Sequence, residues 1–354
     1  MLNHPYPMLL EPRFDAKIWG GRRLETVLGK SLPDEDLYGE SLESDGDSRI
    51  LNGLFAGKTI NELLQIDAHS VLGERGRAAS GEFGDFPLLA KFIDASDVLS
   101  VQVHPNDDEA RLIGKRGKTE AWHIIRAERD ATLITGLKPG VSTEDIARAI
   151  GDVRLGDLVI EQSVSDGDTL LIPAGTTHAI GPGILLYEIQ QASDVTYRMY
   201  DWGRLDPSGF PRDLHVNESL QVVRPELLAD RIASLWIGPG RSMLAACRYF
   251  ALERWELPIE PETIRLDGGT FRLLSAVRGN VRIEADGASI DLATGRTALI
   301  PAAAPSLTIT GDGAVLTSYI PDIQQDVIEP LLRAGHAIED IRRLSGMLDH
   351  LQTG

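Results

Sequence analysis

One sequence frame occurs twice in this chain and limits what the chain can fold into. The first copy, Gly167–His178, has a glycine, five residues, a proline, one residue, a glycine, two residues and a histidine. The second copy, Gly295–Ser306, keeps this spacing but has Ala303 for the second glycine and Ser306 for the histidine. We interpret each copy as a turn, a buried strand and a proline turn that redirects the next side chain. The frame predicts two related β-units, of which the first alone carries the histidine.

Short apolar runs, interrupted by glycine, proline and aspartate, surround both copies of the frame. Strands are predicted within residues 86–94, 98–105, 120–127, 131–137, 168–175 and 184–191, and a second β-rich region within 243–320. Many short strands with turn residues between them favour a sandwich or barrel over alternating βα units. No glycine-rich nucleotide-binding motif is present. The sequence therefore predicts a mainly β fold.

A few helices are predicted outside these strands. Helical spacing occurs at residues 60–72, 142–150 and 219–232, the last interrupted at Pro225. The tail, residues 323–348, predicts two short helices separated at Gly335. We expect residues 73–85 to be a flexible loop. We also expect residues 34–47, which hold seven carboxylates and no base, to form a solvated loop face.

Charge and cysteine content exclude several classes of protein. The 354 residues include 35 Lys and Arg against 53 Asp and Glu, so the formal net charge is −18. This balance disfavours nucleic-acid binding and a polybasic membrane-surface protein, but a local basic site can still bind a small anion. Cys247 is the only cysteine, which excludes internal disulfides and cysteine-rich zinc sites. Because no signal peptide or long apolar run is present, we expect a cytoplasmic protein of about two domains.

Polar side chains occupy one face of the strand predicted within residues 98–105. Alternation places Ser100, Gln102 and His104 on the same face. Glu120 and His178 could join them in a cluster of two imidazoles, one carboxylate and one amide oxygen. Such a donor set suits Zn²⁺ and would also accept other divalent metals. Its single carboxylate would leave a bound ion net positive and able to act as a Lewis acid.

The remaining histidines have a simpler interpretation. A single histidine is more often a packing or half-exposed residue than a metal ligand. We assign to this class His4, His69, His123, His215, His336 and His350. The proline turn before His178 makes that histidine the strongest candidate ligand.

The order of several motifs resembles the type I mannose-6-phosphate isomerases, and the repeated frame is similar to the second motif of the cupin superfamily. The matching segments are KIWGG (17–21), GES (39–41), FPLLAKFIDASDVLSVQVHP (86–105), KTEAWHI (118–124), PAGTTHAIG (173–181) and YEIQQASDVTYRMYDWGR (187–204). The resemblance is dense over residues 10–215 and closest to the short bacterial form, although Leu42 stands where the family often has tryptophan.

This resemblance implies two cupin-type, jelly-roll β-barrels with a few peripheral α-helices. Residues 1–235 would form the catalytic domain with the metal site and helical additions. Residues 236–354 would form a degenerate cupin domain without a metal site, followed by C-terminal helices. The chain would act as a monomer or a homodimer.

The resemblance also implies roles for individual residues. The metal, one zinc ion per chain, would be held by Gln102, His104, Glu120 and His178. The family's basic active-site residues fall on Lys91, Lys118 and Arg198, its carboxylate on Glu188 and its phosphate-binding serine on Ser100. We therefore expect catalytic roles for Arg198, Lys118 and Glu188, and substrate binding by Lys91, Ser100, Lys118 and Arg198. Trp122 and Trp202 are expected to pack.

The implied reaction interconverts mannose 6-phosphate and fructose 6-phosphate through a cis-enediol, so the expected partner is a small phosphorylated sugar, with no nucleic acid and no membrane. The base is left open between Glu188, Lys118 and a metal-bound water, because a protonated Arg198 is a poor base. A metal-dependent cupin oxygenase is an alternative, since two histidines and a carboxylate also bind non-haem iron. A non-catalytic sugar-binding cupin is the other alternative.

Overall fold

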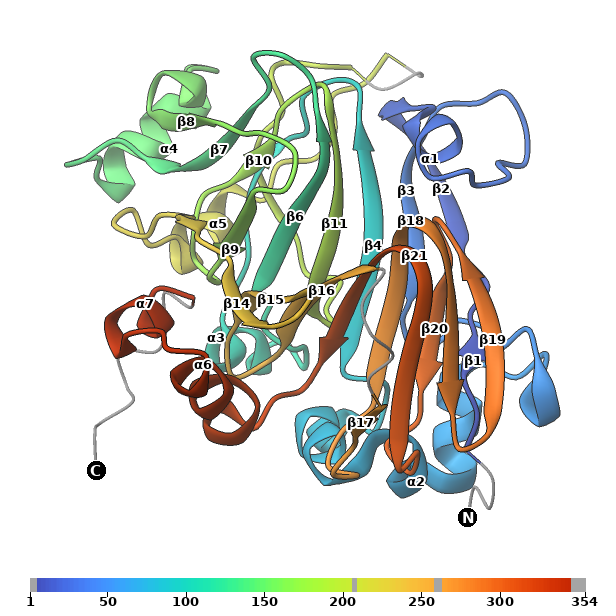
Figure 1. The fold of residues 1–354 in the computed structure, drawn as a ribbon. Coiled ribbons are helices and arrows are strands. Elements are labelled where there is room, and N and C mark those ends of the chain that lie inside the picture. Colours follow the sequence, from blue (N-terminus) through green and yellow to red (C-terminus); the bar gives the residue numbers. More distant parts are fainter. Residues whose placement is uncertain (1–4, 206–208, 258–262, 345–354) are drawn as a thin grey trace.

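The computed structural model describes residues 5–205, 209–257 and 263–344. Its strands form two groups of antiparallel sheets, which stand side by side in Figure 1. The chain from β2 to β13 supplies the first group, and β1 joins the later strands in the second. The expected mainly β architecture with a few helices is confirmed.

The first group is a seven-stranded sheet with two small sheets beside it. Its order is β13 (Arg231–Ile232), β9 (Thr169–Ile172), β6 (Glu120–Ala127), β11 (Ile184–Gln191), β4 (Leu88–Ala95), β3 (Tyr38–Ser44) and β2 (Arg13–Gly21). One small sheet contains β10 (Ala179–Ile180), β7 (Thr132–Leu137) and β8 (Val159–Ser163), and the other contains β12 (Tyr197–Tyr200) and β5 (Val101–Val103). The six strands predicted individually correspond to β4, β5, β6, β7, β9 and β11.

The second group is a single nine-stranded sheet. Its main path is β1 (Met8–Leu9), β20 (Thr297–Ile300), β18 (Arg272–Ala285), β21 (Ser306–Tyr319), β16 (Ala251–Leu257), β15 (Arg241–Ala246) and β14 (Leu235–Gly238). β17 (Thr263–Arg265) pairs with β21, and β19 (Ala288–Ala293) pairs with β18. Apart from β1, β14 and the first two residues of β15, these strands lie in the β-rich region expected within residues 243–320.

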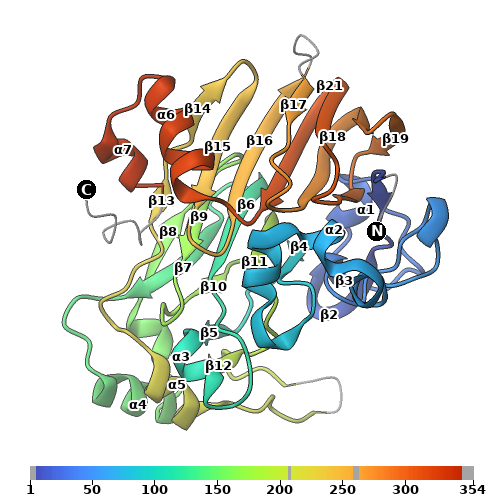
Figure 2. The same ribbon diagram turned by 90° about the horizontal axis from the view of Figure 1, so that it is seen from below.

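The helices lie around the sheets rather than between their strands (Figure 2). They are α1 (Arg23–Thr26), α2 (Ile60–Ser80), α3 (Asp107–Arg111), α4 (Thr143–Gly151), α5 (Val216–Val222), α6 (Glu329–Arg333) and α7 (Ile338–Arg342). Short 3₁₀ turns cover Gly53–Phe55, Gly81–Phe83 and Leu155–Asp157, and a π-helical turn covers Ile323–Ile328. Among the described residues, no helix is both long and apolar enough to cross a membrane.

Two helix predictions differ from the structure. The loop expected at residues 73–85 is instead largely helical, because α2 resumes after a kink and continues to Ser80. Gly73 marks this kink with φ +69°, and a Cβ there would lie 2.5 Å from the Gly268 carbonyl oxygen. The helix predicted across 219–232 is also wrong in extent: α5 ends at Val222 and the chain enters β13 at Arg231.

The other helix predictions agree with the structure. Ser142 caps α4, since its hydroxyl accepts a hydrogen bond from the Asp145 backbone and its own backbone donates to the Asp145 carboxylate, both at 3.1 Å. In the tail, α6 and α7 are separated at Gly335, which has φ +93°. Residues 345–348 of the predicted tail, with His4 and His350, lie outside the described residues.

The two copies of the sequence frame have matching backbones at their start. Gly167 and Gly295 have φ +89° and +77°, and the strands β9 and β20 each begin two residues later. After the proline, the backbones of the two copies differ. In the first, Gly175 has φ +91° and leads to His178, whereas in the second Ser306 begins the long strand β21. The frame therefore produces equivalent strands, but only its first copy ends in a potential ligand.

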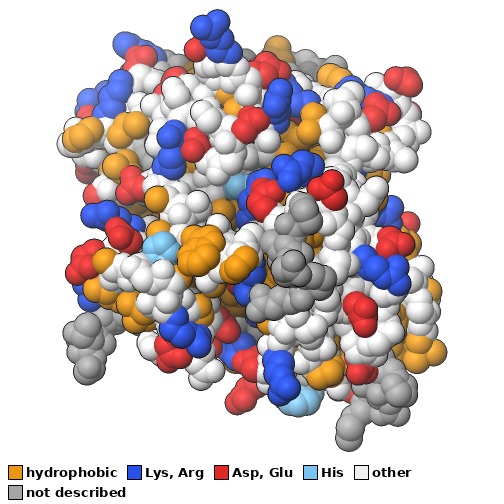
Figure 3. All heavy atoms as spheres, in the orientation of Figure 1, with side chains coloured by type: hydrophobic (Ala, Val, Ile, Leu, Met, Phe, Trp, Pro, Cys, Tyr) orange, Lys and Arg blue, Asp and Glu red, His pale blue; other side chains and the backbone are white. Residues whose placement is uncertain are grey.

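The largest apolar core joins the two sheet groups. It contains Phe92 and Tyr187 of the first group together with Leu273 and Leu316 of the second. Each group also has a core of its own, one around Trp122 and Leu170 and one around Trp255 and Ile283. On the face shown in Figure 3 the acidic and basic side chains are interspersed.

The acidic segment 34–47 is the expected solvated loop only in part: residues 34–37 are exposed and outside any strand, but the middle of the segment is not. Residues 38–44 form β3, and Glu43 is buried there in an ion pair with Lys30, at 2.7 Å. Thr297 donates to the other Glu43 oxygen at 3.0 Å, and Lys30 donates to the Gly295 carbonyl. Since Gly295 and Thr297 belong to the second copy of the frame, this buried pair joins the two sheet groups.

His123 is a second polar contact between the groups, and its role agrees with the packing function expected for it. Its Nδ1 lies 2.9 Å from Thr169 Oγ1, and its Nε2 accepts from Arg254 Nη1 at 3.0 Å. Burial, together with the nearby charge of Arg254, lowers the pKa of His123 to about 3. The folded protein therefore holds this imidazole neutral.

This depressed pKa predicts a specific acid sensitivity. In the unfolded chain His123 takes up a proton near pH 6.5, whereas in the folded chain it does not until about pH 3. The free energy of unfolding should therefore fall by about 2 kcal/mol from this group alone as the pH drops from 7 to 5. Urea titrations in EDTA should show a shallower pH dependence for His123→Gln than for the wild type. The exposed control His69→Gln should follow the wild type, and equal slopes for all three proteins would contradict the prediction.

Candidate active site

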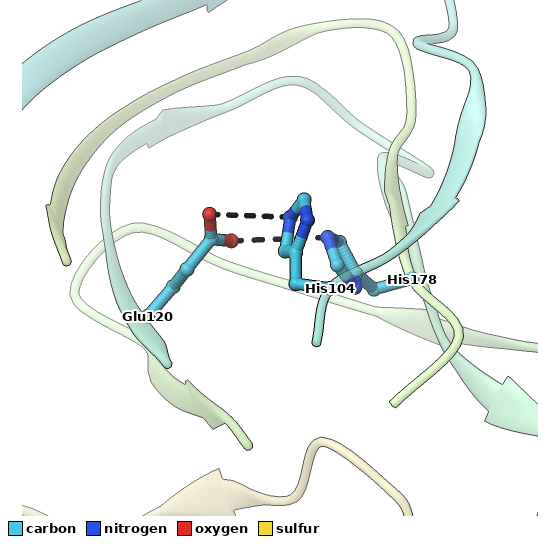
Figure 4. A group of neighbouring side chains, drawn as sticks. All are labelled: His104, Glu120 and His178. Atoms are coloured by element: carbon cyan, nitrogen blue, oxygen red, sulfur yellow. Dashed lines mark ion pairs between the residues drawn. The ribbon is translucent and has the colours of Figure 1, made fainter. Parts of the chain in front are cut away.

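Three buried side chains from separate segments meet beside the start of β6. His104 follows β5, Glu120 begins β6, and His178 precedes β10 (Figure 4). His104 Nε2 lies 3.4 Å from Glu120 Oε1, and His178 Nε2 lies 3.8 Å from Glu120 Oε2. One ligand atom from each residue lies within 4.8 Å of the others. The structure thus brings together three of the four residues expected to hold the metal.

Gln102, the fourth expected ligand, lies directly beside His178. The backbones of these two residues exchange a pair of hydrogen bonds, of 2.9 and 3.0 Å. The Gln102 amide nitrogen donates to Ser100 Oγ at 3.0 Å, which leaves the amide oxygen as its ligand atom. Gln102 and Ser100 line the same cavity as Glu120 and His178.

The proline turn of the first frame holds His178 next to His104. Gly175 donates its backbone N–H to the His104 carbonyl oxygen at 2.8 Å. Its φ of +91° favours glycine, and a Cβ at this position would lie 2.8 Å from Arg224 Cγ. The turn therefore ties the segments of both histidines together before His178 enters the cluster.

The protonation states of the cluster suit a divalent cation. The Thr176 carbonyl accepts from His178 Nδ1 at 2.9 Å, which leaves the Nε2 lone pair facing Glu120. Burial lowers the pKa of His178, and burial with the charge of Lys118 lowers that of His104 to about 3. Burial opposes ionisation of Glu120, but Lys118 and the histidines outweigh it and hold its pKa well below the usual range. Neutral imidazoles and an ionised carboxylate are the forms that bind metals, so these residues fit such an ion.

Lys118 lies within this cluster. Its Nζ is 2.9 Å from Glu120 Oε1 and 3.3 Å from His104 Nε2, and its side chain is buried. Thr196 Oγ1 lies 3.5 Å away. The amine therefore faces both the expected ligands and the cavity, where it can contact a bound substrate oxygen.

A cavity of about 220 Å³ opens beside the cluster. Its charged lining consists of Lys17, Lys91, Lys118, Arg198 and Arg212 with Glu40, Glu120 and Glu188. It also includes Ser100, Gln102 and His178, whereas His104 is not among its lining residues. Five basic and three acidic side chains make the lining net positive in a chain whose total charge is −18. This local reversal of sign suits an anionic substrate.

Strand register places three of the lining residues in one row. Glu188 on β11 stands opposite Lys91 on β4 and opposite Trp122 on β6. Lys91 Nζ lies 3.3 Å from Glu188 Oε1, and Trp122 donates its indole N–H to Glu188 Oε2 at 2.8 Å. Trp122 was expected only to pack, but this hydrogen bond also fixes the Glu188 carboxylate. Trp202 is not among the lining residues.

The charges in this row perturb one another. Burial and the neighbouring charge of Glu120 raise the pKa of Glu188. Burial opposes the charge on Lys91, but the carboxylates of Glu188 and Glu40 outweigh it and raise the pKa of that amine. Lys91 is therefore a permanent cation, and Glu188 is a carboxyl group whose proton affinity is increased.

Arg198 reaches the cavity from β12. It pairs with Gln102 across the β5–β12 ladder and donates from Nη1 to the Asp213 carbonyl at 2.8 Å. Arg212 also lines the cavity, and Asp201 holds it with two hydrogen bonds of 2.6 and 2.7 Å. Two guanidinium groups thus border the space next to the metal-ligand residues.

Two family models match the chain. The model described as phosphomannose isomerase type I, catalytic domain, matches residues 8–123, and the one described as mannose-6-phosphate isomerase, cupin domain, matches residues 241–320. A mannose-6-phosphate isomerase of Bacillus subtilis (strain 168) is 34% identical over 289 residues, which are 78% of this chain and 87% of that protein. The chain belongs to the type I phosphomannose isomerase family.

Another relative and two solved structures are consistent with this membership. A mannose-6-phosphate isomerase of Streptococcus mutans is 32% identical over 88% of this chain and 98% of its own. The crystal structure of the mannose 6-phosphate isomerase from Bacillus subtilis has a TM-score of 0.79 and 30% identity, covering 88% of this chain and 99% of that one. A zinc-bound mannose 6-phosphate isomerase shares the fold at a TM-score of 0.72 and 16% identity, covering 89% of this chain and 99% of that one.

Phosphomannose isomerase membership favours the isomerase over the oxygenase and the non-catalytic cupin. Family membership also accounts for some of the cavity-lining residues to which the sequence analysis assigned no role. The omitted polar and aromatic lining residues are Lys17, Trp19, Glu40, Thr196 and Arg212. The first three lie in the KIWGG and GES segments, so the motifs themselves were the available signal. Arg212 carried no such signal, because it reaches the cavity only through the connection between β12 and α5.

Proposed function

We propose that this chain is a zinc-dependent mannose-6-phosphate isomerase whose substrate binds in the cavity beside Glu120 and His178. The observation that carries the proposal is the meeting of two neutral imidazoles and one carboxylate at a net-positive cavity. Gln102, His104, Glu120 and His178 would hold the ion. When bound, such an ion supplies Lewis-acid stabilisation for the negative charge that develops on the sugar oxygens. The zinc-bound family member makes zinc the first metal to test.

The substrate's phosphate accounts for the basic lining. A phosphoryl group brings nearly two negative charges and three acceptor oxygens, which Lys and Arg side chains bind well. Lys91, Lys118 and Arg198 border the cavity with Ser100, and we assign substrate binding to these four residues. The fixed ion pair between Lys91 and Glu188 would also orient the sugar hydroxyls.

Proton transfer between C1 and C2 needs a group that can both accept and return a proton. Glu188 meets this need for two reasons. Its pKa is raised from the usual carboxyl value in the direction of neutral pH, and Trp122 fixes one of its oxygens. Lys118 is the second candidate, since its amine faces the same cavity. Arg198 would instead bind and stabilise negative charge, as a guanidinium does not release its proton readily.

The domain division and the location form part of the same proposal. Residues 1–235 would carry catalysis, and residues 236–354 would form the second domain without a metal site. The enzyme would act in the cytoplasm, where a single unpaired cysteine is stable and sugar phosphates are available.

The proposal is tested by following mannose 6-phosphate by NMR in D₂O with the zinc-loaded protein under anaerobic conditions. We expect fructose 6-phosphate to appear and deuterium to enter the substrate, with no need for O₂. Mannose without phosphate should react much more slowly, because it lacks the group that the basic lining would bind. A zinc-loaded protein that forms no fructose 6-phosphate would overturn the proposal.

A further inference from the structure

The segment that carries Lys118 is held by hydrogen bonds at every backbone N–H from Gly117 to Thr119. The acceptors are, in chain order, Asp107 Oδ1 at 3.2 Å, the Pro105 carbonyl at 3.0 Å and Gln191 Oε1 at 3.0 Å. Two of these acceptors are side chains, and they bind the residues immediately before and after Lys118. The position of the lysine backbone, just before β6, is therefore set by residues outside its own segment.

Asp107 joins these two side-chain contacts. The oxygen that accepts from Gly117 also accepts from the Gln191 amide nitrogen at 2.9 Å. A Cβ on residue 117 would lie 2.6 Å from the Asp107 backbone nitrogen, so only glycine lets the segment pack against the start of α3. Asp107 and Gln191, which are hydrogen-bonded to each other, thus hold the backbone on both sides of Lys118.

The second oxygen of Asp107 is held from the other sheet group. Tyr249, in the turn between β15 and β16, donates its hydroxyl to Asp107 Oδ2 at 2.7 Å. Arg248 Nη2 lies 3.3 Å from the same oxygen. Burial and the Asp107 carboxylate raise the pKa of Tyr249, which keeps the phenol protonated as a donor. A continuous set of hydrogen bonds therefore runs from the second group of strands to the segment of Lys118.

We propose that Asp107 and Tyr249 are positioning residues for Lys118, so that the second sheet group takes part in catalysis at a site built from the first. Neither residue lines the catalytic cavity. Their effect passes through the backbone of Gly117 and Thr119 to the amine that faces Glu120. The inference rests on the proposed isomerase function, since Lys118 must contact substrate for its placement to affect the rate.

A double-mutant cycle tests this inference in the zinc-loaded, full-length protein. Asp107→Ala should lower kcat about 10- to 100-fold, the range expected when a reacting group is displaced by up to 1 Å. Zinc content should change little, and KM should rise by less than kcat falls, because Lys118 is only one of four residues proposed to bind substrate. Asp107→Asn keeps the acceptor oxygen and should restore kcat to within about threefold of the wild type, a small residual loss for a retained hydrogen bond. Tyr249→Phe should produce a smaller loss than Asp107→Ala.

The decisive measurement repeats Asp107→Ala and Tyr249→Phe in a Lys118→Met background at high enzyme concentration. If both residues act through Lys118, each should cost less than about twofold there, because coupled residues are not additive. Asp108→Ala is the matched control, since Asp108 lies in the same turn of α3 with a side chain 92% exposed. Equal fold-losses in both backgrounds would overturn the inference and leave the isomerase function intact. A zinc-loaded wild type without isomerase activity would instead overturn the proposed function.

Discussion

Replacing His178 with alanine should remove most of the bound metal and the isomerase activity together. His178 supplies one of two neutral imidazoles in the cluster, and its Nδ1 hydrogen bond to Thr176 orients the ring toward Glu120. Because loss of a residue that merely orients a ligand already costs about 10- to 100-fold, loss of the ligand itself should lower kcat/KM by at least about 100-fold. Metal content measured on the purified variant should fall in parallel.

The control for this experiment is His69→Ala, which alters an exposed histidine on α2 and should keep full metal content and activity. Circular dichroism should show that both variants are folded, since the cavity is only one part of a large β structure. A His178→Ala protein that retains full activity without metal would show that the metal site is assigned wrongly. One that retains metal but loses activity would move His178 from the ligand set to another role.

Replacing Glu43 with glutamine should destabilise the protein by about 3–5 kcal/mol, the usual cost of leaving one member of a buried ion pair alone. Lys30 and Glu43 have side chains only 2% and 1% exposed, and neither can be solvated when its partner is neutral. Burial already lowers the pKa of Lys30, with Glu43 opposing that shift. Urea or thermal unfolding of the metal-free protein would measure the loss.

The same pair predicts how the Glu43→Gln variant responds to pH. The unpaired Lys30 should prefer to be neutral in the folded state, so its folded pKa falls further below the unfolded value of about 10.4. Stability lost at pH 7 should then return as the pH rises toward 10, because the unfolded chain no longer gains by protonating this lysine. The wild type should show a smaller recovery, because Glu43 opposes the fall in the Lys30 pKa.

Two comparisons complete the ion-pair experiment. The double variant Lys30→Met/Glu43→Leu should be more stable than Glu43→Gln alone, since apolar side chains need no partner. Asp291→Asn removes an exposed ion pair with Arg282 across β18 and β19 and should cost less than about 1 kcal/mol. A Glu43→Gln loss as small as that of Asp291→Asn would contradict the prediction.

Local sequence patterns were sufficient to predict much of the first sheet group. The run at residues 120–127 coincides with β6, because its apolar residues lie between clear turn signals. Alternation correctly placed Ser100 and Gln102 on one side of β5, where both line the cavity. The Ser142 cap was also readable, because an N-cap depends on residues three positions apart.

The contacts that a sequence pattern could not supply depend on register or on long-range packing. Nothing near Glu188 indicates that it stands opposite Lys91 on one side and Trp122 on the other. The burial of Glu43 was hidden in the same way, since its partners lie at residues 30 and 297. Carboxylates in a polar stretch normally indicate solvent exposure, and only tertiary pairing reverses that expectation.

Strand β1 has a consequence for the order in which the molecule can be completed. Met8 and Leu9 leave the ribosome early, yet they pair with Leu299 and Ala298 on β20, which are made near the end of the chain. At the usual speed of synthesis this separation corresponds to a wait on the order of tens of seconds. The sheet of the second group can therefore be completed only after both β1 and β20 have been synthesised. The chain cannot fold as two independent domains, one after the other, during translation.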